Sequence, residues 1–162
     1  MKVAAVQLTS TGNITENQEL ALAKIREAAG NGARLIVLPE ATAQNFRSGR
    51  LDEQAQTLEG PFATAIQALA EELEVTVVAG MFCPADTVER EGKTINRVTN
   101  TALIAGPGVL GVYDKIHTYD AFDYRESDTV LAGESLVAFD VDDLIVGVAT
   151  CYAVSYTHLT LP

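Results

Sequence analysis

The feature of this sequence that most constrains the fold is an alternation of short apolar runs with longer segments of helical periodicity. The apolar runs cover residues 3–8, 34–38 and 75–82, and each is rich in valine, leucine, isoleucine or alanine, as buried strands are. Between them, apolar residues recur at helical spacing over about residues 15–30 and 61–74. The order strand–helix–strand–helix–strand predicts an α/β layered fold, in which helices cover a sheet.

Local signals mark where both helices begin and where the first one ends. Asn13 and Thr15 are candidate caps of the first helix, and Glu16 stands three residues after Asn13, in the position of a capping box. Gly30-Asn31-Gly32 predicts the end of this helix, because glycine readily takes the left-handed conformation of a helix C-cap. Pro61 suits the first position of the second helix, where no backbone N–H is needed.

Two hairpins are predicted in the second half of the chain. Residues 95–105 and 109–114 form strands joined at Gly106-Pro107-Gly108, which is a strong turn signal. After a polar stretch, residues 136–141 and 144–149 form a second predicted pair with a two-residue turn. Strand–helix–strand units combined with hairpins indicate a mixed sheet rather than a purely parallel one.

The composition limits the environment and the partners of the chain. It has 162 residues, 48% of them hydrophobic, which suits one domain with a substantial core. The formal net charge of −11 argues against nucleic acid or an anionic membrane as partner, since both attract clustered Lys and Arg. Two cysteines give no disulfide framework, and no apolar run approaches the ~18 residues of a membrane span. We therefore expect a cytoplasmic protein without membrane association.

Three chemically reactive side chains follow predicted strands. Glu40 comes just past the second strand, Lys115 just past the strand that ends at Asp114, and Cys151 just past the last strand. In open α/β sheets, sites form outside the carboxyl ends of strands, so the three side chains converge if these ends are adjacent. Each residue also has an ordinary interpretation: Glu40 and Lys115 as solvated loop charges, and Cys151 as an inert core thiol. Cys83 is expected to be a structural thiol.

A thiol, a carboxylate and an ammonium group together can carry out acyl transfer. A free cysteine is mostly protonated at neutral pH, so a nearby carboxylate is needed to accept its proton. A nearby lysine favours the thiolate and can stabilise the oxyanion that forms when sulfur attacks a carbonyl. The carboxylate can then return the proton to a leaving amine. The trio therefore indicates a Cys–Glu–Lys site, in which glutamate has the role often held by histidine.

The segments around these residues resemble the carbon–nitrogen hydrolase (nitrilase) superfamily. LIVLPE at 35–40 is similar to the family segment that carries a glutamate base, and YDKIHTYDAFDYRES at 113–127 to the segment that carries a lysine. VGVATCY at 146–152 is similar to the segment that carries the nucleophilic cysteine. The resemblance covers residues 1 to about 152, and it implies a partial α-β-β-α sandwich with a mixed sheet.

The resemblance also implies a role for each matching residue. Cys151 would be the nucleophile, Glu40 the general base and later the acid, and Lys115 the group that stabilises the tetrahedral intermediate. The backbone N–H of Tyr152 would assist Lys115, and Glu126 would orient the reacting groups. The implied reaction is hydrolysis of a non-peptide C–N bond through a thioester, with a small-molecule amide and water as partners. Neither a metal nor an organic cofactor is implied.

The segment at 113–127 favours an amidase of the ω-amidase or deaminated-glutathione type, acting on a small carboxylate-bearing amide. The full-length form of such a family member is expected to be a homo-oligomer. Residues 153–162 do not resemble the family, so we interpret 1–152 as the N-terminal part of a carbon–nitrogen hydrolase domain and 153–162 as a tail from truncation or a frameshift. Two alternatives stay open: an inactive fragment or pseudoenzyme that lacks the rest of the pocket, and a domain of an acyltransferase or glutamine-fed synthetase.

Overall fold

The structure, a computed structural model, describes residues 1–153. Residues 154–162 lie outside the described residues, and with them all but the first residue of the predicted tail at 153–162. In chain order the elements are β1 (Val3–Ala5), α1 (Ile14–Gly30), β2 (Leu35–Val37), the 3₁₀ helix η1 (Leu51–Glu53), α2 (Pro61–Glu72), β3 (Thr76–Arg90), β4 (Lys93–Gly106), β5 (Val109–Asp114), β6 (Asp120–Ala121), β7 (Tyr124–Arg125), the 3₁₀ helix η2 (Glu126–Asp128), β8 (Val130–Leu131), β9 (Ala138–Val141) and β10 (Leu144–Gly147).

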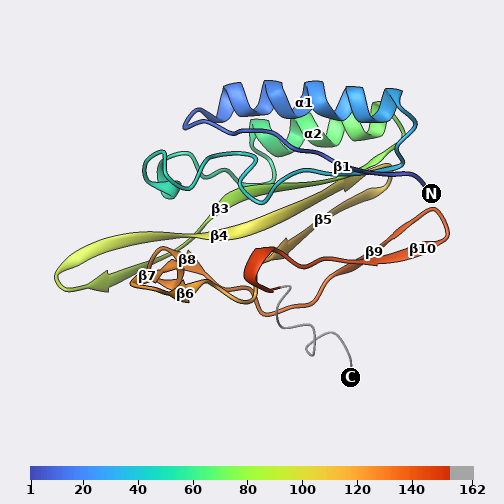
Figure 1. The fold of residues 1–162 in the computed structure, drawn as a ribbon. Coiled ribbons are helices and arrows are strands. Elements are labelled where there is room, and N and C mark those ends of the chain that lie inside the picture. The colour runs from blue at the N-terminus through green and yellow to red at the C-terminus, as the bar shows by residue number, and fades with distance from the viewer. Residues whose placement is uncertain (154–162) are drawn as a thin grey trace.

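A mixed sheet forms the centre of the fold (Figure 1). Its strands lie in the order β1-β2-β3-β4-β5, and β8 also pairs with β4. Strands β1, β2 and β3 run parallel because α1 and α2 connect them, whereas β4 and β5 are added antiparallel through hairpins. The predicted combination of parallel and antiparallel pairing is confirmed. Since β5 runs parallel to β2 and β3, the carboxyl ends of β2 and β5 lie at the same edge of the sheet.

Both long helices cover one face of this sheet and enclose the larger hydrophobic core (Figure 1). The predicted helical spacing corresponds to the buried stripes, since Ile25 of α1 and Ile66 of α2 are fully buried. They pack in the same core as Ile36 of β2 and Val77 of β3. Each buried side chain of this size contributes about 1.5–3 kcal/mol of hydrophobic free energy, so this layer holds the strands whose ends carry the reactive groups.

The hairpin of β9 and β10 lies on the opposite side of the sheet and begins a third layer (Figure 1). Phe139 and Val141 of β9 pack with Leu35 of β2 and Ile104 of β4 in a second, smaller core. The predicted two-residue turn, Asp142-Asp143, joins the two strands. Helices, sheet and hairpin are therefore stacked as in one part of an α-β-β-α sandwich.

The ends of the first helix follow the local signals, with one exception. Asn13 caps α1, since its side-chain oxygen accepts hydrogen bonds from the backbone N–H groups of Thr15 and Glu16. The capping box is incomplete, because the Glu16 carboxylate accepts from the Thr11 hydroxyl and not from the N–H of Asn13. Gly32 follows the helix with a φ of +84°, as the predicted stop requires. No helix within residues 1–153 is both long enough and apolar enough to cross a membrane.

The strand β3 is much longer than the sequence predicted and β4 is slightly longer, whereas β1, β2, β9 and β10 are shorter than the predicted strands. The strands predicted at 75–82 and 95–105 correspond to parts of β3 and β4, which continue as one long hairpin that turns at Glu91-Gly92. No apolar pattern marks the extension, because most of its side chains are polar and exposed. The first predicted strand, 3–8, ends at Ala5, since its partner β2 has only three residues.

Candidate active site

The position of Glu40 is set just after β2, where the chain crosses closely over the backbone of β3. The N–H of Leu38 continues the ladder by donating to the Val78 carbonyl at 2.8 Å, and the chain then turns across β3 at Pro39. A Cβ atom at Gly80 of β3 would lie 1.7 Å from the carbonyl oxygen of Glu40, so only glycine fits there. The crossing holds Glu40 at the carboxyl edge of the sheet, which is the strand-end position predicted from the sequence.

Lys115 follows β5 and is anchored through its backbone on two sides. Its N–H donates to the carbonyl oxygen of Asn100 on β4 at 2.8 Å, and its own carbonyl accepts from the N–H of Gly133 at 2.9 Å. The side chain is only 2% exposed. A buried ammonium group is tolerated only with charged or polar partners, so Lys115 needs such partners inside the protein.

Glu126 lies in the short helix η2 and is held by a tight loop. Its backbone N–H donates to the Tyr119 carbonyl at 3.1 Å, and the N–H of Tyr119 donates to the Glu126 carboxylate at 2.7 Å. Asp120 stabilises the same loop, because its carboxylate accepts hydrogen bonds from the hydroxyl and the N–H of Ser127. These hydrogen bonds lower the pKa of Asp120. The loop therefore places Glu126, which is only 2% exposed, in the site.

Lys115 lies between two carboxylates and forms the centre of the site. Its Nζ atom is 3.0 Å from Oε1 of Glu40, and 3.1 and 2.9 Å from Oε1 and Oε2 of Glu126. Burial by itself would lower the pKa of Lys115, but the hydrogen bonds and charges of Glu126 and Glu40 outweigh it and raise that pKa. Lys115 therefore stays positively charged at neutral pH.

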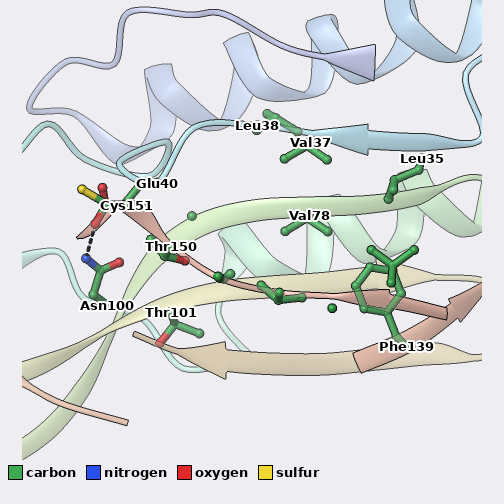
Figure 2. Close-up of a pocket in the computed structure, with 16 residues that line it drawn as sticks. Leu35, Val37, Leu38, Glu40, Val78, Asn100, Thr101, Phe139, Thr150 and Cys151 are labelled. Atoms are coloured by element: carbon green, nitrogen blue, oxygen red, sulfur yellow. Dashed lines mark hydrogen bonds between the residues drawn. The ribbon is translucent and has the colours of Figure 1, made fainter. Parts of the chain in front are cut away.

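Cys151 follows β10 at a strained point of the backbone, beside Glu40 (Figure 2). Its φ of +49° lies in the left-handed region, which costs a non-glycine residue about 1–3 kcal/mol. Burial, the charge of Glu40 and a hydrogen bond to that carboxylate raise the pKa of the Cys151 thiol, whereas Lys115 and the backbone N–H of Tyr152 act to lower it. Because its pKa is raised, Cys151 keeps its proton at neutral pH and has Glu40 as the adjacent acceptor.

Two cavities open on Glu40 and Cys151. The first, of about 230 Å³, lies between the sheet and the β9–β10 hairpin and is lined mainly by aliphatic side chains (Figure 2). The second, of about 430 Å³, is lined by Glu40, Phe46, Arg47, Lys115, Tyr119, Tyr124, Glu126 and Cys151. The two predicted glutamates, the lysine and the cysteine thus share one cavity, although they come from four separate segments of the chain.

Tyr152 is half-buried next to Cys151. Its ring packs edge-to-face against the ring of Tyr119, with ring centres 5.3 Å apart, which connects the turn at Cys151 to the loop that holds Glu126. The backbone N–H of Tyr152 acts on the Cys151 sulfur, since it lowers the pKa of that thiol. Its contribution to an oxyanion hole stays a prediction.

Asn100 and Gly80 are parts of the site that sequence patterns did not reveal. Asn100 lies in β4, is 1% exposed, and donates from its side-chain amide to Oε1 of Glu40 at 2.7 Å and to Oε1 of Glu126 at 3.2 Å. The available signal was an asparagine inside the strand predicted at 95–105, where a buried amide has to find a partner. The second cysteine, Cys83, is a half-buried thiol that lines neither cavity, and burial raises its pKa.

The chain is similar to known proteins along its whole length. The family model described as carbon-nitrogen hydrolase matches residues 2–162. The hydrolase Rv0480c of Mycobacterium tuberculosis is 38% identical over 98% of this chain and 55% of its own length. A deaminated glutathione amidase of Synechocystis sp. is 34% identical over 96% of this chain and 59% of its own length. The chain therefore spans little more than half of these relatives, and the boundary at residue 152 stays a prediction.

A solved structure has the same fold. The crystal structure of XC1258 from Xanthomonas campestris, a CN-hydrolase superfamily protein, matches with a TM-score of 0.79 at 23% identity, over 97% of this chain and 55% of that one. At this identity the likeness concerns the fold alone. It confirms the predicted α/β fold with a mixed sheet, as part of a nitrilase-type sandwich.

Replacing Gly80 by alanine is expected to destabilise the chain by about 1–3 kcal/mol, because the added methyl group overlaps the backbone of Glu40. Urea unfolding followed by circular dichroism measures this free energy. Gly30→Ala is the matched control: a Cβ atom there meets nothing within 4 Å, so stability should be unchanged or slightly higher. Equal stability of the two variants would contradict the close crossing at Gly80.

Glu40→Gln is expected to lower the pKa of the Cys151 thiol, because the change removes a negative charge that opposes the thiolate and a strong acceptor for the thiol proton. The rate of Cys151 alkylation by iodoacetamide, followed by peptide mass spectrometry across pH, should then have its midpoint at lower pH. Glu72→Gln, at an exposed position of α2, should leave the midpoint in place. A midpoint that is unchanged or higher in Glu40→Gln would show that Glu40 does not act on this thiol.

Proposed function

Because the chain belongs to the carbon–nitrogen hydrolase family, we propose that it carries out hydrolysis of a non-peptide C–N bond in a small carboxylate-bearing amide, through a cysteine thioester. The observation that carries this proposal is the cavity shared by Cys151, Glu40, Lys115 and Glu126. It offers a thiol, a proton acceptor and a cation to one small molecule. The similarity to a deaminated glutathione amidase supports an amide as the substrate class.

In the first step, the sulfur of Cys151 attacks the amide carbonyl carbon while the thiol proton passes to Glu40. The raised pKa of the thiol makes this transfer necessary, since little thiolate exists beforehand. The carbonyl oxygen becomes negatively charged, and the Lys115 ammonium group with the backbone N–H of Tyr152 stabilises it. Lys115 suits this role because it is buried and kept cationic by two carboxylates.

In the second step, the C–N bond breaks, Glu40 gives its proton to the departing nitrogen, and ammonia leaves. The acyl group remains on the Cys151 sulfur as a thioester. Water then attacks the thioester carbonyl and loses a proton to Glu40, which passes it to the departing sulfur as the C–S bond breaks. A carboxylic acid leaves and the free thiol is restored. Glu126 exchanges no proton in this sequence and holds Lys115 by two hydrogen bonds.

Arg47 supports a substrate that carries a carboxylate. Its side chain lines the cavity that contains Cys151, beside Phe46, Tyr119 and Tyr124. Arg47 is exposed, and among residues 1–153 no carboxylate forms an ion pair with it. A guanidinium group can bind a carboxylate through two parallel hydrogen bonds. A molecule with an amide at one end and a carboxylate at the other therefore suits this cavity.

A second proposal is that the chain carries the residues of the site without activity, as an inactive fragment or pseudoenzyme. The observation in its favour is the apolar surface of β10, where Ile145 is 80% exposed and Leu144 is 51% exposed. Consecutive residues of a strand point to opposite faces, so Ile145 lies, with its partner Asp140, on the face of the hairpin that turns away from Phe139 and Val141. A strongly exposed isoleucine on that outer face is typical of a side chain that another layer covers. The chain also spans only 55% of the length of its relative from Mycobacterium tuberculosis.

The first proposal predicts that the chain releases ammonia from succinamic acid, a small amide with a carboxylate at its other end. Cys151→Ala should lower this activity by about 10³-fold or more, because the thioester can no longer form. A coupled enzymatic assay measures the ammonia, and Cys83→Ala is the matched control, because Cys83 lines neither cavity. No ammonia from the folded chain would favour the second proposal. Activity that survives Cys151→Ala would contradict the thioester route.

Arg47→Gln is expected to lower kcat/KM for succinamic acid about tenfold or more, mainly through KM, because a hydrogen bond to a charged group is worth about 1.5–3 kcal/mol. For butyramide, a neutral amide of the same chain length, kcat/KM should change little. Arg26→Gln, at an exposed position of α1, is the matched control. An equal loss with both amides would show that Arg47 does not recognise the carboxylate.

A further inference from the structure

Asn100 contacts both carboxylates of the site, and we propose that it is a positioning residue that decides which oxygen of Glu40 takes the proton of Cys151. In this arrangement Asn100 and Lys115 hold Oε1 of Glu40, and Oε2 is the oxygen left for the proton. The inference rests on the proposed function, because it assigns Asn100 a role within that reaction.

Asn100 lies inside the sheet, where a buried polar side chain needs hydrogen-bond partners. It is 1% exposed and is paired in β4 with Phe82 of β3. Its side-chain amide donates to Glu40 and to Glu126, and its backbone carbonyl accepts from the N–H of Lys115. One neutral residue therefore contacts all three charged members of the site.

Four hydrogen bonds close into a ring. Nδ2 of Asn100 lies 2.7 Å from Oε1 of Glu40 and 3.2 Å from Oε1 of Glu126, and Nζ of Lys115 lies 3.0 and 3.1 Å from the same two oxygens. Figure 2 shows the bond between Asn100 and Glu40 next to Cys151. Oε1 of Glu40 thus accepts two N–H donors from opposite members of the ring.

An oxygen that already accepts two N–H donors is a poor place for a proton. A proton on Oε1 of Glu40 would face the donors of Asn100 and Lys115, and at least one of the two bonds would have to break. A proton on Oε2 leaves both bonds intact, because Oε1 remains an acceptor in the neutral carboxyl group. The two donors therefore direct the proton to Oε2 and keep the carboxyl plane fixed while the proton arrives and leaves.

Asn100 and Lys115 make different contributions to this arrangement. Lys115 supplies the positive charge, but an ammonium group on a flexible four-carbon chain does not fix the orientation of the carboxylate that it contacts. The side chain of Asn100 is short and planar and projects from a strand inside the sheet. Its two side-chain N–H groups therefore point in two fixed directions. Without Asn100, Lys115 would still balance the charge of Glu40, but the orientation of the Glu40 carboxyl group would no longer be fixed.

The test measures the pH midpoint at which the Glu40 carboxyl group titrates, by NMR of its carboxyl carbon in the full chain, with Glu40→Gln to assign the signal. Asn100→Leu keeps a similar volume but donates no hydrogen bond to the charged carboxylate, so the midpoint should rise by about one pH unit. Asn100→Asp adds a negative charge and should raise it further. Asn17→Leu is the matched control: Asn17 is also 1% exposed, but its side chain bonds only to backbone atoms of Thr11 and Ala43.

The same upward shift should appear in the acidic limb of the pH profile of kcat for ammonia release, with KM nearly unchanged. A shifted NMR midpoint in a chain that releases no ammonia would support the role of Asn100 and count against the proposed function alone. A folded Asn100→Leu variant with an unshifted midpoint would overturn the inference, because Asn100 would then only fill its place in the sheet.

If the Asn100 variants do not fold, the inference can be tested on the wild-type chain. The side-chain amide signals of Asn100 should move with pH at the same midpoint as the carboxyl carbon of Glu40, and this movement should vanish in Glu40→Gln. Amide signals that stay constant through the titration of Glu40 would overturn the inference.

Discussion

The whole site depends on one buried ammonium group held between two carboxylates. Lys115 is 2% exposed, and a charge in such a place is tolerated only when its partners are present and well aligned. Glu40 comes from the end of β2, Lys115 from the end of β5 and Glu126 from η2, so three distant segments have to pack together before the ion pairs can form. Formation of the sheet and assembly of the site are therefore coupled.

The groups around Lys115 stand where the backbone has little freedom. Glu40 crosses β3 over Gly80, and Cys151 has a left-handed conformation at the start of a short turn. Such positions persist only when the surrounding structure holds them in place. Here the helices support the sheet from one face and the β9–β10 hairpin supports it from the other, through two separate hydrophobic cores.

Much of this architecture could be predicted because it follows from local patterns. Apolar spacing indicated the helices and the buried strands, and glycine and proline indicated the turn at 106–108, which joins β4 and β5. The polar extension of the β3–β4 hairpin could not be predicted, since a ribbon exposed on both faces carries no apolar pattern. Asn100 could not be assigned either, because an asparagine in a predicted strand can have many partners, and the sequence does not identify them.

The sequence by itself determined the chemistry of the reactive groups and their places just past strands, as the positions of Glu40, Lys115 and Cys151 demonstrate. It could do so because the end of an apolar run is a local property of the chain. The tertiary structure decided which groups meet. Glu40 and Lys115 are 75 positions apart, and their contact depends on the order β2-β3-β4-β5 in the sheet. That order, and with it the bridge that Asn100 makes from β4, arises from pairing between distant strands, which no single segment encodes.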